Sequence, residues 1–148
     1  MFGSWWSRLI GGGTKLSHLE FEFLLLLIDA LPEAMKSIVK TQFEAFNLVQ
    51  REVDGRALNF YRMKGGKADT TGLPLLKTTQ MEAPLVKITA NISGESEAVH
   101  AVLTAVNGQA FSVTFSRRIS NIRSGEILEV TRVKQAWRSV VSGIASAV

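Results

Sequence analysis

The sequence contains no cysteine and only two histidines, His18 and His100. Without cysteine the chain has no disulfide bonds, thiolate metal ligands or cysteine nucleophiles, and it is compatible with a reducing compartment. A transition-metal site would need both histidines and nearby carboxylates to converge, so we expect no metal. The chain also lacks a Walker loop, a dinucleotide-binding glycine turn and a nucleophile elbow. We therefore expect no cofactor and favour a protein that is not an enzyme.

Long apolar runs are also missing from the sequence. The densest run covers residues 23–28, whereas a helix that spans a membrane needs about 20 apolar residues. The first residues do not show a basic start followed by a sustained apolar stretch, which would indicate a signal peptide. We therefore expect a cytoplasmic protein. The 148 residues, 46% hydrophobic and 20% charged, have the length and composition of one folded domain.

The net charge of +4 comes from one segment of the chain. Acidic and basic residues balance up to residue 116. Residues 117–138 hold Glu126, Glu129 and a basic strip that consists of Arg117, Arg118, Arg123, Arg132, Lys134 and Arg138. Such a strip is typical of a solvated edge strand, and also of a surface for an acidic partner, an anionic membrane or a phosphate backbone. Few aromatic residues interleave with it, so nucleic acid binding ranks below the other interpretations.

The clearest structural signal is Asn107-Gly108, which lies between two apolar runs. This pair predicts a hairpin with a two-residue turn, because both turn residues of that type need a positive φ. The short turn fixes the register, in which Thr104 faces Phe111 and His100 faces Phe115. We assign the bulkier face of this hairpin to the core together with His100; it carries Val102, Val106, Phe111, Val113 and Phe115.

Two helices are predicted before this hairpin. Ser17 with Glu20 fits a capping box at the start of the first helix. Pro32 suits the beginning of the second helix, which runs to about residue 46. The first helix is apolar around most of its circumference, so we expect it to be buried on more than one side.

After the helices, the apolar period changes from 3.6 to 2. Asp54-Gly55 predicts a second hairpin, in which Val49 faces Phe60. A connection of about 20 residues follows at 64–83, a length that is often functional. Further strands are expected at residues 85–92 and 126–133, and the imperfect alternation of the last one suits an edge strand or a bulge.

This order of elements predicts an α+β fold, with two N-terminal helices packed on a curved antiparallel sheet of five to six strands, cone-like or roll-like. The order is similar to that of cystatin-like rolls and of cones of the nuclear-transport-factor type, although no motif residue supports kinship. We divide the chain into an N-terminal arm with a glycine hinge (1–14), a single α+β domain (15–136) and an amphipathic C-terminal segment (137–148).

Both ends of the chain carry a short apolar stripe at helical spacing. The stripes consist of Phe2, Trp5, Trp6 and Leu9 at one end and of Trp137, Val140, Val141 and Ile144 at the other. Stripes of this kind are typical of surfaces that the domain itself, a sister subunit or a partner covers. Paired tryptophans are also compatible with a peripheral membrane contact, which ranks lower.

Three functions follow from these patterns. The terminal stripes favour a non-enzymatic protein-interaction or assembly module, with a homo-oligomer or a protein partner. The alternative is a small-ligand-binding or enzymatic domain with a pocket near His100, where a buried imidazole would be a candidate general acid or base. A core histidine with a satisfied hydrogen bond competes with that interpretation. Binding of nucleic acid to the basic strip is the third possibility.

Overall fold

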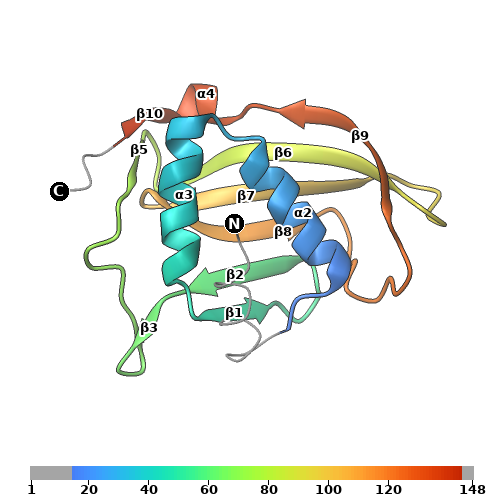
Figure 1. The fold of residues 1–148 in the computed structure, drawn as a ribbon, viewed down its shortest axis with the longest axis horizontal. Coiled ribbons are helices and arrows are strands. Elements are labelled where there is room, and N and C mark those ends of the chain that lie inside the picture. The colour runs from blue at the N-terminus through green and yellow to red at the C-terminus, as the bar shows by residue number, and fades with distance from the viewer. Residues whose placement is uncertain (1–14, 145–148) are drawn as a thin grey trace.

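A six-stranded antiparallel sheet is covered on one face by two helices (Figure 1). The computed structural model describes residues 15–144. Its main elements are α2 (His18–Asp29), α3 (Glu33–Ala45), β1 (Leu48–Arg51), β2 (Ala57–Tyr61), β6 (Glu82–Ile92), β7 (Val99–Val106), β8 (Gln109–Phe115) and β9 (Ile127–Lys134). The strand order is β1-β2-β8-β7-β6-β9; α2 contacts β6 and β7, and α3 contacts β8. The predicted α+β fold is confirmed.

Helix α2 begins where the sequence predicts. Ser17 is its N-cap, and the hydroxyl of Ser17 accepts a hydrogen bond from the backbone N–H of Glu20 at 3.2 Å. The Glu20 carboxylate in turn accepts one from the backbone N–H of Ser17 at 2.8 Å, which completes the capping box. Phe23 is fully buried and meets Phe115 of the sheet edge to face, with ring centroids 5.8 Å apart. The cap therefore fixes the start of a helix whose apolar side forms the core.

Gln42 fastens α3 to the sheet from inside the core. Its side chain is fully buried. The amide donates hydrogen bonds to the carbonyls of Pro74 (2.7 Å) and Gly108 (3.1 Å), and its oxygen accepts one from the backbone N–H of Ala110 (2.8 Å). A buried carboxamide with three partners carries little desolvation penalty. It ties one helix to the hairpin turn and to the long connection.

The hairpin turn at Asn107-Gly108 forms as predicted, with φ of 51° and 83°. The predicted register, however, is correct only next to the turn, where Val106 pairs with Gln109. A β-bulge then shifts β8 by one residue, so that Thr104 pairs with Ser112 instead of Phe111. Phe111 is the extra residue. Such a bulge changes which face of the sheet each following side chain occupies.

The bulge overturns the predicted core face of β7. The buried residues of this strand are Val99, Ala101, Leu103 and Ala105, and they pair with the buried part of β8 through Leu103–Val113 and Ala101–Phe115. Val113 and Phe115 are core residues, as expected, but Val102, Val106 and Phe111 are only half-buried and His100 is exposed. The predicted face would have buried Thr104 and His100, and each unpaired buried polar group costs about 1–3 kcal/mol. With the bulge, the side of both strands that faces the helices buries only apolar side chains.

The long predicted connection contains three short strands, β3 (Met63–Lys64), β4 (Lys67–Ala68) and β5 (Leu76–Thr78). β3 pairs with β4 in a small hairpin. β5 pairs with β10 (Val141–Ile144) near the end of the described chain. The second of these pairings joins the connection to the C-terminal part of the described chain.

The C-terminal segment is helical for only one turn, α4 (Trp137–Val140). Over Val141–Ile144 the predicted helical spacing is not realised, because the chain is extended there and pairs with β5. The backbone N–H of Thr79 donates to the carbonyl of Val140 at 2.8 Å and so begins this pairing. Trp137 and Val140 are buried in the domain itself.

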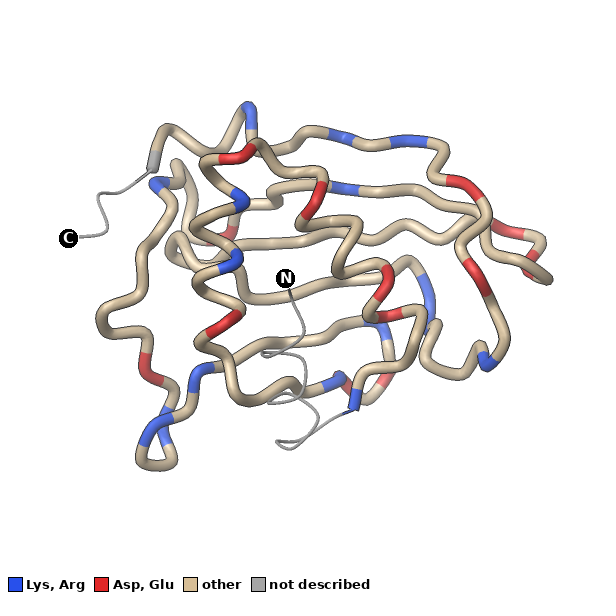
Figure 2. The backbone as a smooth tube through the Cα atoms, viewed as in Figure 1, with Lys and Arg blue, Asp and Glu red and all other residues tan. Residues whose placement is uncertain are grey.

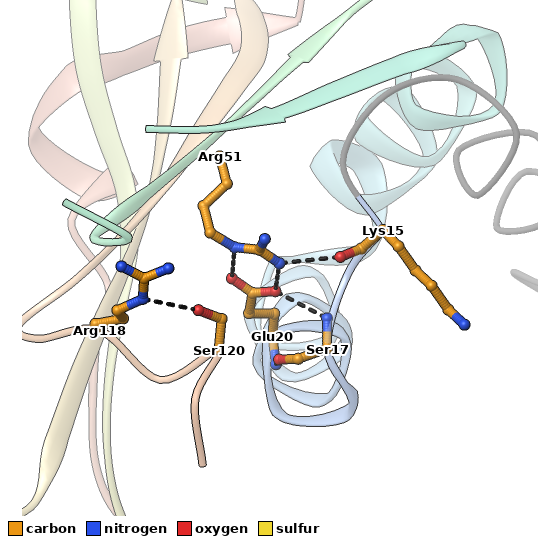
Figure 3. A network of polar contacts seen from close by, with 6 residues as sticks. All are labelled: Lys15, Ser17, Glu20, Arg51, Arg118 and Ser120. Carbon is orange, nitrogen blue, oxygen red and sulfur yellow. Dashed lines mark hydrogen bonds and ion pairs between the residues drawn. The ribbon is translucent and has the colours of Figure 1, made fainter. Parts of the chain in front are cut away.

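One ion pair joins the start of α2 to the edge strand β1 (Figure 3). The carboxylate of Glu20 is fully buried, and Arg51 binds both of its oxygens, with Nε 2.8 Å from Oε2. The same guanidinium donates to the carbonyl of Lys15 at 2.9 Å. The hydrogen bond with Glu20 raises the pKa of Arg51, against a smaller opposing effect of burial. Glu20 thus serves both the helix cap and the contact between helix and sheet.

We expect Arg51→Ala to lower the free energy of unfolding by about 3 kcal/mol, because removing one partner of a buried pair leaves the other charge uncompensated. Urea denaturation measures this change. Asp29→Ala is the matched control, since it removes an exposed partner of Lys36 and should cost less than about 1 kcal/mol. Equal losses in the two variants would contradict the role assigned to Glu20 and Arg51.

Candidate anion-binding site on the outer face of the sheet

The face of the sheet opposite the helices carries a small basic pocket. It lies on β6, β7 and β9, has a volume of about 130 Å³ and is lined by Lys87, Thr89, His100, Arg132 and Lys134. Figure 2 shows Lys and Arg residues in blue on the neighbouring strands β6 and β9. The site therefore combines His100, the candidate from the pocket hypothesis, with two residues of the basic strip.

Strand register brings these side chains together. Lys87 lies directly opposite Lys134, and Thr89 lies between Arg132 on β9 and His100 on β7. A bulge in β9 leaves one residue between Arg132 and Val130 without a partner on β6. This bulge lies beyond Arg132, so Lys134 to Arg132 pair with Lys87 to Thr89 without interruption. Three adjacent strands thus contribute to one point on a rigid surface.

His100 is held by two interactions. Its ring Nδ1 lies 2.7 Å from Oγ1 of Thr89, and its backbone N–H donates to Oγ of Ser116 at 3.0 Å. The second ring nitrogen, Nε2, has no protein partner within residues 15–144. The imidazole is therefore oriented, while one nitrogen remains for a ligand.

The charges of the pocket are unbalanced. None of its five lining residues is acidic. Within the described part of the chain, Lys87, Arg132 and Lys134 form no ion pair. Like charges placed directly across two strands, such as Lys87 and Lys134, destabilise a sheet. An anion in the pocket would relieve this repulsion and accept hydrogen bonds from ammonium, guanidinium and hydroxyl groups.

The rest of the predicted basic strip does not join the site. Arg117 forms an ion pair with Glu95, with 2.7 Å between Nη1 and Oε1. Arg118 donates to Oγ of Ser120 at 3.2 Å, and Arg138 donates to the side-chain oxygen of Gln135. Arg123 lines a separate hollow together with Arg117 and Arg118. The strip is therefore divided among different parts of the surface.

Lys87 and Thr89 are the site residues that the sequence analysis missed. Their position on the wet face of a predicted strand was visible, because Lys87 and Thr89 alternate with buried Ile88. Which strand lies beside them was not visible, because β6 and β9 are separated by the whole β7–β8 hairpin. The sequence therefore indicated the outward position of Lys87 and Thr89 but not which strand lies beside them.

The predicted terminal stripes are placed only in part. Phe2, Trp5, Trp6 and Leu9 lie outside the described residues. Trp137 and Val140 are buried in the domain, and Val141 is half-buried. Ile144 pairs with Leu76 through β10 and β5. Trp137 and Val140 of the C-terminal stripe are thus covered by their own chain, and Val141 is covered in part.

Other classes of site gain no support from residues 15–144. His18 pairs with Glu22 on the exposed side of α2, 3.2 Å apart. No group of three His, Asp or Glu residues with metal-binding geometry occurs in this part of the chain. Nor does any of its helices combine the length and apolar character needed to cross a membrane. Comparisons with protein-family models, curated proteins and solved structures return no match.

We expect Lys134→Gln to raise the free energy of unfolding at low salt by about 0.2–1 kcal/mol, because it removes the like-charge pair with Lys87. The gain should shrink in high salt, which screens the repulsion. Lys77→Gln is the control, since Lys77 is exposed on β5 and lies opposite Gly143. A Lys134 variant that is less stable than the wild type would argue against unrelieved repulsion.

Proposed function

We propose that the protein binds a ligand through an oxyanion of the phosphate type, held on the outer face of its sheet. The observation that carries this proposal is the convergence of Lys87, Arg132, Lys134 and His100 on one pocket without an acidic lining residue. Natural sheets usually avoid like charges on directly opposite residues because of their cost. Retaining such a cost is typical of a site that needs its charges to bind a ligand.

The shape of the cluster favours a single anionic group over a long polyanion. A phosphate backbone is usually bound by a continuous basic surface, often with aromatic platforms. In this sheet, the residues that pair in line with Lys87 on the next two strands are Val102 and Thr114, and both are uncharged. The charge of Arg117 is neutralised by Glu95. A pocket of about 130 Å³ on rigid strands suits one compact group. We therefore place the ligand among small phosphorylated molecules.

The proposal is tested by titrating inorganic phosphate into the full chain and following backbone amide shifts by NMR. We expect shifts that centre on Thr89, His100 and Arg132. Arg132→Gln should weaken phosphate at least about tenfold, because a hydrogen bond to a charged group contributes about 1.5–3 kcal/mol. Lys134→Gln should also weaken phosphate binding, and it should raise the free energy of unfolding.

Arg123→Gln is the matched control for this titration, because it removes the same charge from another part of the basic strip. It should leave the affinity unchanged. If Arg123→Gln and Arg132→Gln weaken phosphate to the same extent, the effect is one of net charge and no site exists. Chloride at equal ionic strength supplies the reference for screening.

Assembly with another protein chain is the second candidate function. The observation that favours it is the edge strand β9, where Leu128, Val130 and Val133 are exposed, with 66%, 36% and 45% of their surface accessible. An edge strand with exposed apolar side chains is a template for pairing with another strand. Its two bulges and the charges of Arg132 and Lys134 oppose such pairing. The assembly hypothesis therefore ranks second.

We expect the double variant Val130→Glu with Val133→Glu to have a lower native mass than the wild type if β9 mediates assembly. Light scattering on the full chain measures this directly. Val53→Glu is the control, because Val53 is fully exposed in the loop between β1 and β2. A wild type that is monomeric at all concentrations would remove the assembly hypothesis for this edge.

A further inference from the structure

A second pocket lies at the opposite end of the outer face, beside the Asn107-Gly108 turn. Its volume is about 300 Å³, within the range of small-molecule sites. One wall comes from β2 and β8, and the other comes from the connection that leads to β5. The side chains that matter for its chemistry are Tyr61, Phe111, Leu75 and Gln109. None of them belongs to the basic pocket.

The β-bulge in β8 creates the aromatic wall. Phe111, the extra residue of the bulge, is half-buried instead of facing the helices. Its ring meets Tyr61 edge to face, with centroids 5.3 Å apart and an interplanar angle of 83°. Bulges commonly re-aim a side chain next to a binding site. Two perpendicular rings therefore line the space that the bulge opens.

The opposite wall is fixed by its own hydrogen bonds. Arg62 donates through Nη1 to the carbonyl of Thr71 at 2.8 Å, and the backbone N–H of Asp69 donates to the carbonyl of Arg62 at 2.8 Å. The Asp69 carboxylate accepts from the backbone N–H of Thr71 at 2.9 Å. The connection is thus closed into an ordered loop. A pocket with a preformed wall loses less conformational entropy when a ligand binds.

Gln109 provides the polar group of this pocket. Only 8% of its surface is accessible, yet its carboxamide has no protein hydrogen-bond partner within residues 15–144. Gln42, by contrast, is fully buried and makes three hydrogen bonds. Within residues 15–144 the one buried side-chain polar atom without a hydrogen-bond partner is Nε of Arg117, so the carboxamide atoms of Gln109 remain in contact with solvent and are available to a ligand. A carboxamide presents one acceptor and one donor side by side, so it matches a ligand edge with the same pair of groups.

We propose that this pocket binds a small planar ring that carries an amide-like donor and acceptor edge. The ring packs against Phe111 and Tyr61, and its polar edge exchanges two hydrogen bonds with Gln109. This site is independent of the anion pocket, because no lining residue is shared between the two.

The probes that test this inference are benzamide, which has both the ring and the edge, toluene, which has the ring alone, and acetamide, which has the edge alone. Each is titrated into the full chain and followed by NMR. We expect benzamide to shift the amides of Tyr61, Gln109 and Phe111 at millimolar concentration and to bind more tightly than either fragment.

Variants separate the two contributions. Gln109→Leu keeps the approximate size of the side chain and removes its amide, so the affinity for benzamide should fall at least about tenfold. The affinity for toluene should stay the same or rise. Phe111→Ala should weaken both ring probes. His100→Ala, in the anion pocket, should leave benzamide unaffected. A thermal unfolding curve verifies that each variant is folded.

Two results would overturn the inference. One is the lack of any benzamide shift at this pocket in the wild type. The other is equal binding of benzamide and toluene together with no effect of Gln109→Leu, which would leave an apolar crevice without recognition. Loss of phosphate binding in the earlier titration would not bear on either result, because the two pockets are distinct.

Discussion

The packing of the helices on the sheet depends on one extra residue in β8. Phe111 shifts the register so that Leu103 lies beside Val113 and Ala101 beside Phe115, and these four face the core that includes Phe23. Full burial of one such apolar side chain contributes about 1.5–3 kcal/mol. These four residues include several such side chains, so their burial outweighs the loss of regular strand pairing at a single bulge. The bulge is therefore a requirement of the core.

The same register decides what the outer face presents. Since β7 turns its apolar row inward, His100 faces outward beside Thr89, where β6 and β9 supply Lys87 and Arg132. The repulsion on that face costs at most about 1 kcal/mol per pair, which the core on the other face easily offsets. A sheet with one well-buried face can thus tolerate an unfavourable arrangement of charges where a ligand is to be bound. Phe111 itself becomes part of the wall of the second pocket.

Two buried polar groups hold the helices in the position that this core requires. Glu20 joins the first turn of α2 to Arg51 on the edge of the sheet (Figure 3). Gln42 joins α3 to the hairpin turn and to the connection. Both groups are fully paired, so they restrict the relative position of the layers without a large desolvation penalty. Both pockets therefore lie on a framework that is braced from the helical side.

The sequence by itself determined the local features of this protein. Ser17 with Glu20 marks a helix start, and Asn107-Gly108 marks a turn, because cap and turn chemistry act within a few residues. The element order, the antiparallel sheet, the pairing of Val49 with Phe60 and the irregular edge strand followed from the same kind of signal. Only the tertiary structure decided the bulge at Phe111, since the advantage of burying Leu103 and Ala101 together appears when α2 is in place. It also brought Lys87 to Lys134 and turned His100 outward, because strands distant in the chain become neighbours only when the sheet is formed.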